Sequence, residues 1–273
     1  MNESQPDSPD SELAELSPWA PPAADLETMA PHPPIGPPGL WGPWATIGWT
    51  VLCILVLYGA QLAALIIFVL FRSVTTGNTR FEDLATSGNY LAFATLLSTP
   101  ATVGFIALLV WLRGYPIRGY LALRWPPLRS AVTAFLGLAV VLVGTDLTSY
   151  LTGRPLVPTV MVDFYRNSWL PGLLFAMVVL APLGEETLFR GFLYAGITAS
   201  RAGPIVAIIV STVAFAALHV QYDWYGIAGV AAIGLYLGVI RFWTRSLFLT
   251  MILHGVANVV ATLELVIQEH WLK

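Results

Sequence analysis

The segment Leu180–Gly191, with the sequence LAPLGEETLFRG, places two carboxylates and a guanidinium in the middle of an apolar run. Glu186 and Arg190 are four residues apart with the acid first, which is the favoured order for an ion pair within one helix. Glu185 lies about 100° around the helix from Glu186, so one arginine cannot easily serve both acids. We therefore expect Glu186 and Arg190 to form a structural pair, which leaves Glu185 available as a general base. The alternative is that both acids belong to one structural ion-pair network.

Two other apolar runs each carry a histidine that forms an i, i+4 pair with a second side chain. Phe215 and His219 lie in the sequence FAALH, and His254 and Asn258 lie in HGVAN, so each pair is expected on one face of its helix. His254 and Asn258 could offer two hydrogen-bond donors to a developing oxyanion. Alternatively, these two side chains bond to each other or to a neighbouring helix, as polar residues in membrane helices commonly do.

Taken together, the three segments supply a carboxylate, two imidazoles and an amide. Ionisable groups in membrane helices cost at least about 2.5 kcal/mol each, so they usually face the interior of the bundle and mark function. This set of groups suits the activation of water and the stabilisation of a tetrahedral oxyanion. It therefore predicts hydrolysis of an acyl or peptide bond.

The composition indicates that membrane helices position these groups. Of the 273 residues, 56% are hydrophobic and 11% are charged, against about 25% charged in an ordinary soluble domain. The mean hydropathy is +0.72. The 13 basic residues are scattered without a run that could follow phosphates, which argues against a nucleic-acid partner. We predict an all-α, polytopic transmembrane helical bundle in the cell membrane, with the lipid bilayer as its surroundings.

Seven apolar runs approach the length needed to cross a hydrocarbon core of about 30 Å. The run 169–198 carries Glu185 and Glu186 in its middle, and it is predicted to form one tilted helix or two pieces broken near Pro182. The predicted number of membrane helices is therefore seven, or eight if both pieces cross. The runs are 44–71, 90–112, 130–151, 169–198, 204–221, 225–241 and 246–266.

Residues 1–43 differ from the rest of the chain, because they hold seven acids, no base and eleven of the 20 prolines. Such a segment cannot bury enough apolar area to offset its ordering entropy, so we predict a disordered tail followed by the bundle over 44–273. The loop between the second and third runs carries four arginines and no acid, which places this loop, and hence the tail, in the cytoplasm. Among residues taken to lie in later loops, Arg201, Arg241 and Arg245 agree with this orientation, whereas Arg154 and Arg166 do not.

The three pairs resemble, in order, the motifs of a known family. EExxxR at Glu185–Arg190, FxxxH at Phe215–His219 and HxxxN at His254–Asn258 are similar to the three motifs of the CPBP family. This family, also called Abi, contains the CAAX proteases and bacteriocin-processing enzymes, and it includes the Ras-converting CAAX endopeptidases. The resemblance covers about residues 169–262 and implies an all-helical transmembrane bundle with a catalytic cavity inside the membrane.

The resemblance also implies a role for each motif residue. The implied catalytic residues are Glu185, His219, His254 and Asn258, and the implied supporting residues are Glu186, Arg190 and Phe215. Of these, Glu185 and His219 would activate water, and His254 and Asn258 would form the oxyanion hole. The implied activity is that of an intramembrane endopeptidase, and its partner is a membrane-associated or lipidated protein or peptide substrate.

A metal ion is the main alternative to this mechanism. The family is often labelled metalloprotease, and Glu185, His219 and His254 could hold Zn²⁺ with one open position. The chain lacks the sequence HExxH, in which two histidines and an acid act together. If all three residues bound zinc, the remaining candidate for a base would be Glu186, which is expected to pair with Arg190. We therefore predict a glutamate-activated water with no required cofactor, and zinc remains the alternative.

Two functions without proteolysis also stay open. A bacteriocin-immunity or scaffold protein could keep the fold and act by contact, although contact alone does not require Glu185. A proton-coupled transporter could use the glutamate and histidines as a relay. Such a transporter would be expected to show repeated halves with broken helices, and the sequence shows no such repeat.

Overall fold

The computed structural model describes residues 41–77, 84 and 86–271, and all regular secondary structure among these residues is helical. The predicted disordered tail lies outside the described residues except for 41–43. Trp41 is buried against Tyr120 and Phe192, and the first described helix begins at Pro43. The bundle therefore begins slightly before residue 44, the predicted start.

Six of the described helices are long and apolar enough to cross a membrane, so the protein is a multi-pass helical membrane bundle. Five of them are α3 (Pro43–Thr76), α5 (Gly88–Leu112), α7 (Leu128–Leu151), α13 (Trp224–Thr244) and α14 (Leu247–Trp271). The sixth is a composite of α9 (Leu170–Phe175), η1 (Ala176–Leu180), α10 (Ala181–Glu186), η2 (Thr187–Leu193) and α11 (Tyr194–Thr198). The shorter helices are α6 (Ile117–Tyr120), α8 (Thr159–Arg166) and α12 (Gly203–Ala217).

The helix from α9 to α11 is continuous, so the predicted alternative of two pieces broken near Pro182 is wrong. Two π-helical stretches, η1 and η2, interrupt its α-helical hydrogen bonding. Stretches of this kind are rare and occur frequently at functional sites. Glu185 and Glu186 end the short α-helical piece between them, so the carboxylates lie where the backbone departs from regular geometry.

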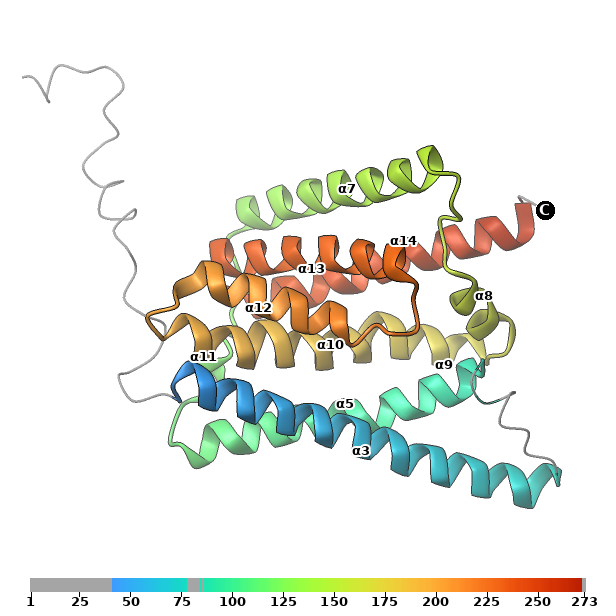
Figure 1. The fold of residues 1–273 in the computed structure, drawn as a ribbon, viewed down its shortest axis with the longest axis horizontal. Coiled ribbons are helices and arrows are strands. Elements are labelled where there is room, and N and C mark those ends of the chain that lie inside the picture. Colours follow the sequence, from blue (N-terminus) through green and yellow to red (C-terminus); the bar gives the residue numbers. More distant parts are fainter. Residues whose placement is uncertain (1–40, 78–83, 85, 272–273) are drawn as a thin grey trace, which may run out of the picture. The chain divides into compact units, whose positions relative to one another are not determined.

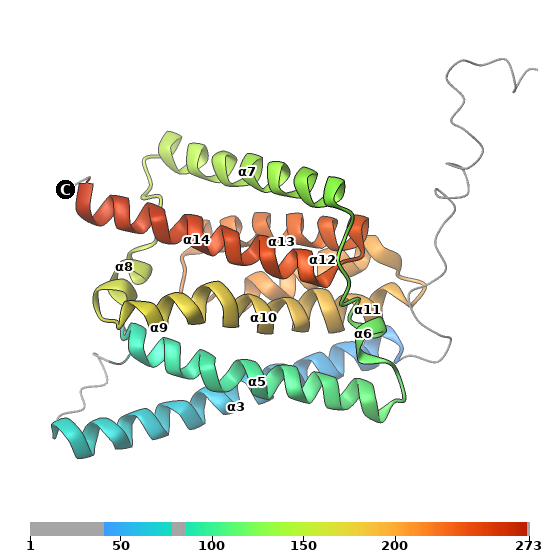
Figure 2. The ribbon, with the colours of Figure 1, turned by 180° about the vertical axis from the view of Figure 1, so that it is seen from behind.

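This composite helix lies in the middle of the bundle (Figure 1). Helices α3 and α5 run side by side along one flank of it, and α12, α13 and α14 lie along the other. Helix α7 lies beyond α13 and α14, as the reverse view also shows (Figure 2). The helix that carries the first motif is therefore covered on both flanks, which shields its charged groups from lipid.

Helix α12 is shorter than the predicted run 204–221. It has 15 residues and is about 22 Å long, which is less than a hydrocarbon core of about 30 Å. The described residues therefore contain six candidate spans instead of the predicted seven or eight. The chain leaves α12 after Ala217 because it must reverse before α13, where the side chain of Asp223 caps the new helix by accepting from Gly226 N at 2.8 Å. His219 thus lies beyond the end of α12, which corrects the prediction that it lies on a helix face.

Candidate active site

The first motif forms the buried ion pair that its spacing predicts. Arg190 Nη1 lies 2.9 Å from Glu186 Oε1, and both side chains have no exposed surface. Arg190 Nη2 also donates to the carbonyl oxygen of Gly234 in α13 at 2.8 Å, and the guanidinium carbon lies 4.4 Å from the ring centre of Phe215 in α12. A Cβ on Gly234 would lie 3.0 Å from Arg190 Nη2, so glycine allows this close approach of α13. The pair thereby joins the central helix to two of its neighbours.

His254, which α14 supplies, lies between the two carboxylates. Its Nδ1 is 3.0 Å from Glu186 Oε1, and its Nε2 is 3.7 Å from Glu185 Oε2. Because an ionised carboxylate only accepts hydrogen bonds, Nδ1 carries the hydrogen and Nε2 is the nitrogen beside Glu185. The motif spacing predicts that Glu186 pairs with Arg190 alone, so the contact between Glu186 and His254 was not predicted.

Glu185 lines a cavity of about 820 Å³ that lies among α7, α10, α13 and α14. The side chain of Glu185 is 28% exposed, whereas that of Glu186 is fully buried. This difference agrees with the predicted division between a free and a paired carboxylate. The same cavity is lined by all four residues predicted to be catalytic, namely Glu185, His219, His254 and Asn258.

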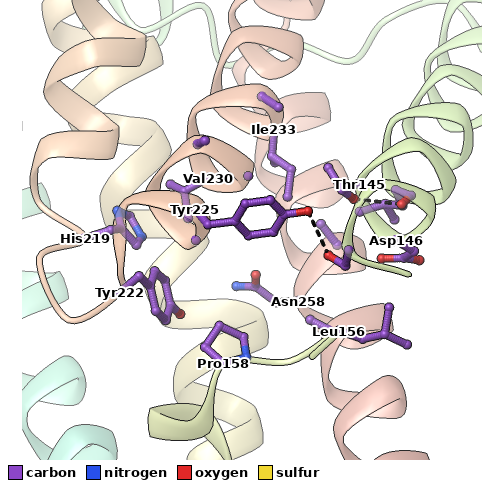
Figure 3. A pocket seen from close by; sticks show the side chains of 18 of the residues that line it. Thr145, Asp146, Leu156, Pro158, His219, Tyr222, Tyr225, Val230, Ile233 and Asn258 are labelled. Atoms are coloured by element: carbon purple, nitrogen blue, oxygen red, sulfur yellow. Dashed lines mark hydrogen bonds between the residues drawn. The ribbon is translucent and has the colours of Figure 1, made fainter. Parts of the chain in front are cut away.

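His219 faces this cavity from the segment that follows α12 (Figure 3). Its Nδ1 donates to the carbonyl oxygen of Phe215 at 2.9 Å, so Nε2 is left as the accepting nitrogen of the neutral ring. Tyr222 stacks on this ring with 5.9 Å between the ring centres. Burial raises the pKa of the Tyr222 hydroxyl to about 12, so this group stays protonated at neutral pH. Tyr222 was not among the residues predicted from the sequence, although it lies three residues after a motif histidine.

Asn258 supplies a hydrogen-bond donor that the backbone of the central helix lacks. At the end of η1, Ala181 N–H donates to Ala176 O, five residues earlier. The next bond of this series would run from residue 182 to Met177 O, but Pro182 has no N–H. Asn258 Nδ2 donates to Met177 O instead, at 2.7 Å. One amide hydrogen of Asn258 therefore joins α14 to the central helix, as in the alternative that these side chains bond to a neighbouring helix. The second amide hydrogen is still available to a ligand.

Gly255 allows α14 to come close enough for this contact. A Cβ at this position would lie 2.7 Å from the carbonyl oxygen of Val178, which is closer than carbon atoms normally approach a backbone oxygen. Val178 is also the residue whose carbonyl an ordinary α-helix would pair with residue 182. The proline in the central helix and the glycine and asparagine in α14 thus form one structural unit.

The described side chains do not assemble a three-ligand metal site. No group of three His, Cys, Asp or Glu residues among them is placed to hold one ion. Both His219 and His254 donate from Nδ1 to an oxygen, as metal-bound histidines usually do, so the chemistry of the donors alone would suit zinc. Their placement around Glu185, however, does not form a zinc site among the described residues. Independence from metal stays a prediction.

The fold and the site together define a polytopic membrane protein with carboxylate, imidazole and amide groups around a cavity between its helices. Residues 167–260 match the family model described as type II CAAX prenyl endopeptidase Rce1-like. Over this part of the chain the match confirms the resemblance to CAAX-type proteases that the three motifs predict over about 169–262. No curated protein and no solved structure matches the chain.

Proposed function

We propose that the protein hydrolyses a peptide bond of a membrane-associated or lipidated protein or peptide within this cavity. One observation carries the proposal: inside the matched domain, Glu185 reaches the cavity beside an imidazole whose other nitrogen is fixed by a second carboxylate. A carboxylate and an oriented imidazole are the groups that general acid–base catalysis requires. The arginine-rich loop before α7 supports a cytoplasmic position for the N-terminal tail.

In the first step, Glu185 takes a proton from a water molecule in the cavity. The accepting Nε2 of His219 binds the second hydrogen of this water and orients it. The water oxygen then bonds to the carbonyl carbon of the substrate, and the π electrons of that carbonyl move to its oxygen. The product is a tetrahedral oxyanion, and Glu185 carries the transferred proton.

In the second step, the proton on Glu185 passes to Nε2 of His254. With Nδ1–H bonded to Glu186, Nε2 can donate to the oxyanion only after it has received this proton. The second amide hydrogen of Asn258 supplies another donor. When the oxyanion collapses, the C–N bond breaks, the departing nitrogen takes the proton from His254, and the other fragment leaves with a new carboxyl group.

Substrate trapping tests this proposal directly. Wild-type protein and the Glu185→Ala variant are expressed at equal levels in membranes, and new protein ends are compared by terminal proteomics. We expect membrane-associated proteins that are cut by the wild type to remain intact with the variant. Identical end profiles, with both proteins folded, would argue for action by contact.

Asn258→Ala should separate catalysis from helix packing. Loss of one oxyanion donor lowers kcat by about 10²–10³, with KM within a few-fold of wild type. The unpaired Met177 carbonyl should also lower stability by about 0.6–1.7 kcal/mol. Pro182→Ala restores a backbone N–H, so the variant Pro182→Ala/Asn258→Ala should regain stability without regaining kcat. A large rise in KM at unchanged kcat would contradict the oxyanion role, and recovery of activity in the double variant would make Asn258 purely structural.

Metal removal gives a second prediction for the purified enzyme. Treatment with a strong chelator should leave most of the activity, because Glu185 and His254 can move the proton without an ion. Elemental analysis should find less than one zinc per chain. Stoichiometric zinc whose removal and return change the activity in parallel would overturn the metal-free mechanism.

A further inference from the structure

Arg241 is a fully buried cation near the C-terminal end of α13. Arg241 was predicted to lie in a loop because the predicted run ended at 241, but the helix continues to Thr244. Its guanidinium carbon lies 5.0 Å from the ring centre of Tyr194, and neither of its Nη atoms has a hydrogen-bond partner among the described residues. A buried cation is costly in a membrane helix and is usually kept for function, and the mechanism above makes no use of this one.

The hydrogen bond that Arg241 makes leads directly to the candidate site. Arg241 Nε donates to the carbonyl oxygen of Arg190 at 2.9 Å. Gly234, whose carbonyl accepts from the Arg190 side chain, lies seven residues before Arg241, and this spacing puts both on one face of α13. Helix α13 therefore holds Arg190 at two points, one on its main chain and one on its side chain.

We propose that Arg241 is a positioning residue that sets the orientation of His254 through Arg190 and Glu186. Arg190 lies in η2, where the main chain departs from α-helical hydrogen bonding, and the bond from Arg241 adds a contact between its carbonyl and α13. With its backbone held, Arg190 Nη1 meets Glu186 Oε1, and the same oxygen accepts from His254 Nδ1. Displacement of this series of groups would move Nε2 of His254 relative to Glu185.

The orientation of His254 can be measured without any activity. Protein labelled with ¹⁵N in its four histidines is examined by NMR in lipid nanodiscs, and the Nδ1–H signal of His254 is assigned with His254→Gln. We expect Arg241→Met to broaden or shift this hydrogen-bonded signal. Arg201→Met, which removes an exposed arginine, should leave it unchanged, and Arg241→Lys should restore part of it. An unchanged signal in folded Arg241→Met would overturn the proposal.

Kinetics supply the second test, which rests on the proposed function. A displacement of about 1 Å in a catalytic group can cost about 10²-fold in rate, so Arg241→Met should lower kcat by about 10-fold or more with KM within about threefold. In the Glu186→Ala background the same substitution should add little, because the side chain that connects Arg190 to His254 is already absent. Fully additive losses would show that Arg241 acts on overall stability and would overturn the proposal. If the wild-type protein cleaves nothing but the expected NMR result is obtained, the proposed function is refuted. The positioning of His254 by Arg241 is then still established.

Discussion

Glu185→Gln should lower kcat by about 10²–10⁴, the range expected when a general base is lost, while the unfolding temperature stays near that of the wild type. The physical reason is that the Glu185 side chain is partly exposed in the cavity and makes no ion pair with Arg190. The amide keeps the shape of the side chain but cannot take a proton from water. The measurement is peptide hydrolysis in nanodiscs, paired with thermal unfolding of the same samples.

The matched control for Glu185→Gln is Asp163→Asn in α8, which removes a carboxylate at a position outside the cavity lining. This control should keep both activity and stability. If Glu185→Gln retained wild-type kcat, water activation by this carboxylate would be excluded. If it unfolded instead, both acids of the first motif would belong to one structural network, which is the alternative that the sequence left open.

Glu186→Gln should have the largest effect on stability, with a loss of about 3–5 kcal/mol. The substitution leaves Arg190 as an unpaired charge in a fully buried position, and it replaces the charged acceptor of His254 Nδ1–H by a neutral amide oxygen. Chemical denaturation in mixed micelles would measure the loss. Activity should fall as well, since a neutral amide holds and polarises the His254 ring less strongly than a carboxylate does.

Removal of both charges provides the control for Glu186→Gln. The variant Glu186→Gln/Arg190→Met buries no uncompensated ion, so it should recover a large part of the lost stability. It should not recover activity, because His254 still lacks its carboxylate partner. If the Glu186→Gln protein had wild-type stability but no activity, the roles assigned to Glu185 and Glu186 would be reversed.

The parts of the site that are local in sequence could be predicted, and the parts that depend on packing could not. Glu186 and Arg190 pair because residues four apart in a helix are neighbours wherever the helix lies. The contact between Glu186 and His254 joins residues 68 apart, and no spacing rule fixes how two distant helices meet. The second use of Asn258, its bond to Met177 O, likewise required knowledge of which helix lies opposite Pro182.

The boundaries of the helices show the same division. Hydropathy predicted the spans because it measures compatibility with lipid, but it does not report where backbone hydrogen bonding stops. The run 204–221 is largely apolar as far as Val220, yet α12 ends at Ala217, so His219 was assigned to the wrong element. The opposite error affected Arg241, which was assigned to a loop because the predicted run ended there, although α13 continues past it.

The position of the ion pair within a single helix has a consequence for biosynthesis. Glu186 and Arg190 are one turn apart, so they can neutralise each other as soon as their helix enters the bilayer, where a lone charge at mid-helix costs about 2.5–3.5 kcal/mol to insert. His254 and Asn258 arrive only with α14, which is translated after every other described helix. A nascent chain can therefore carry a charged helix into the membrane before the whole candidate site exists. Under the proposed mechanism, proteolysis becomes possible only when α14 docks, so the order of translation delays activity until the bundle is assembled.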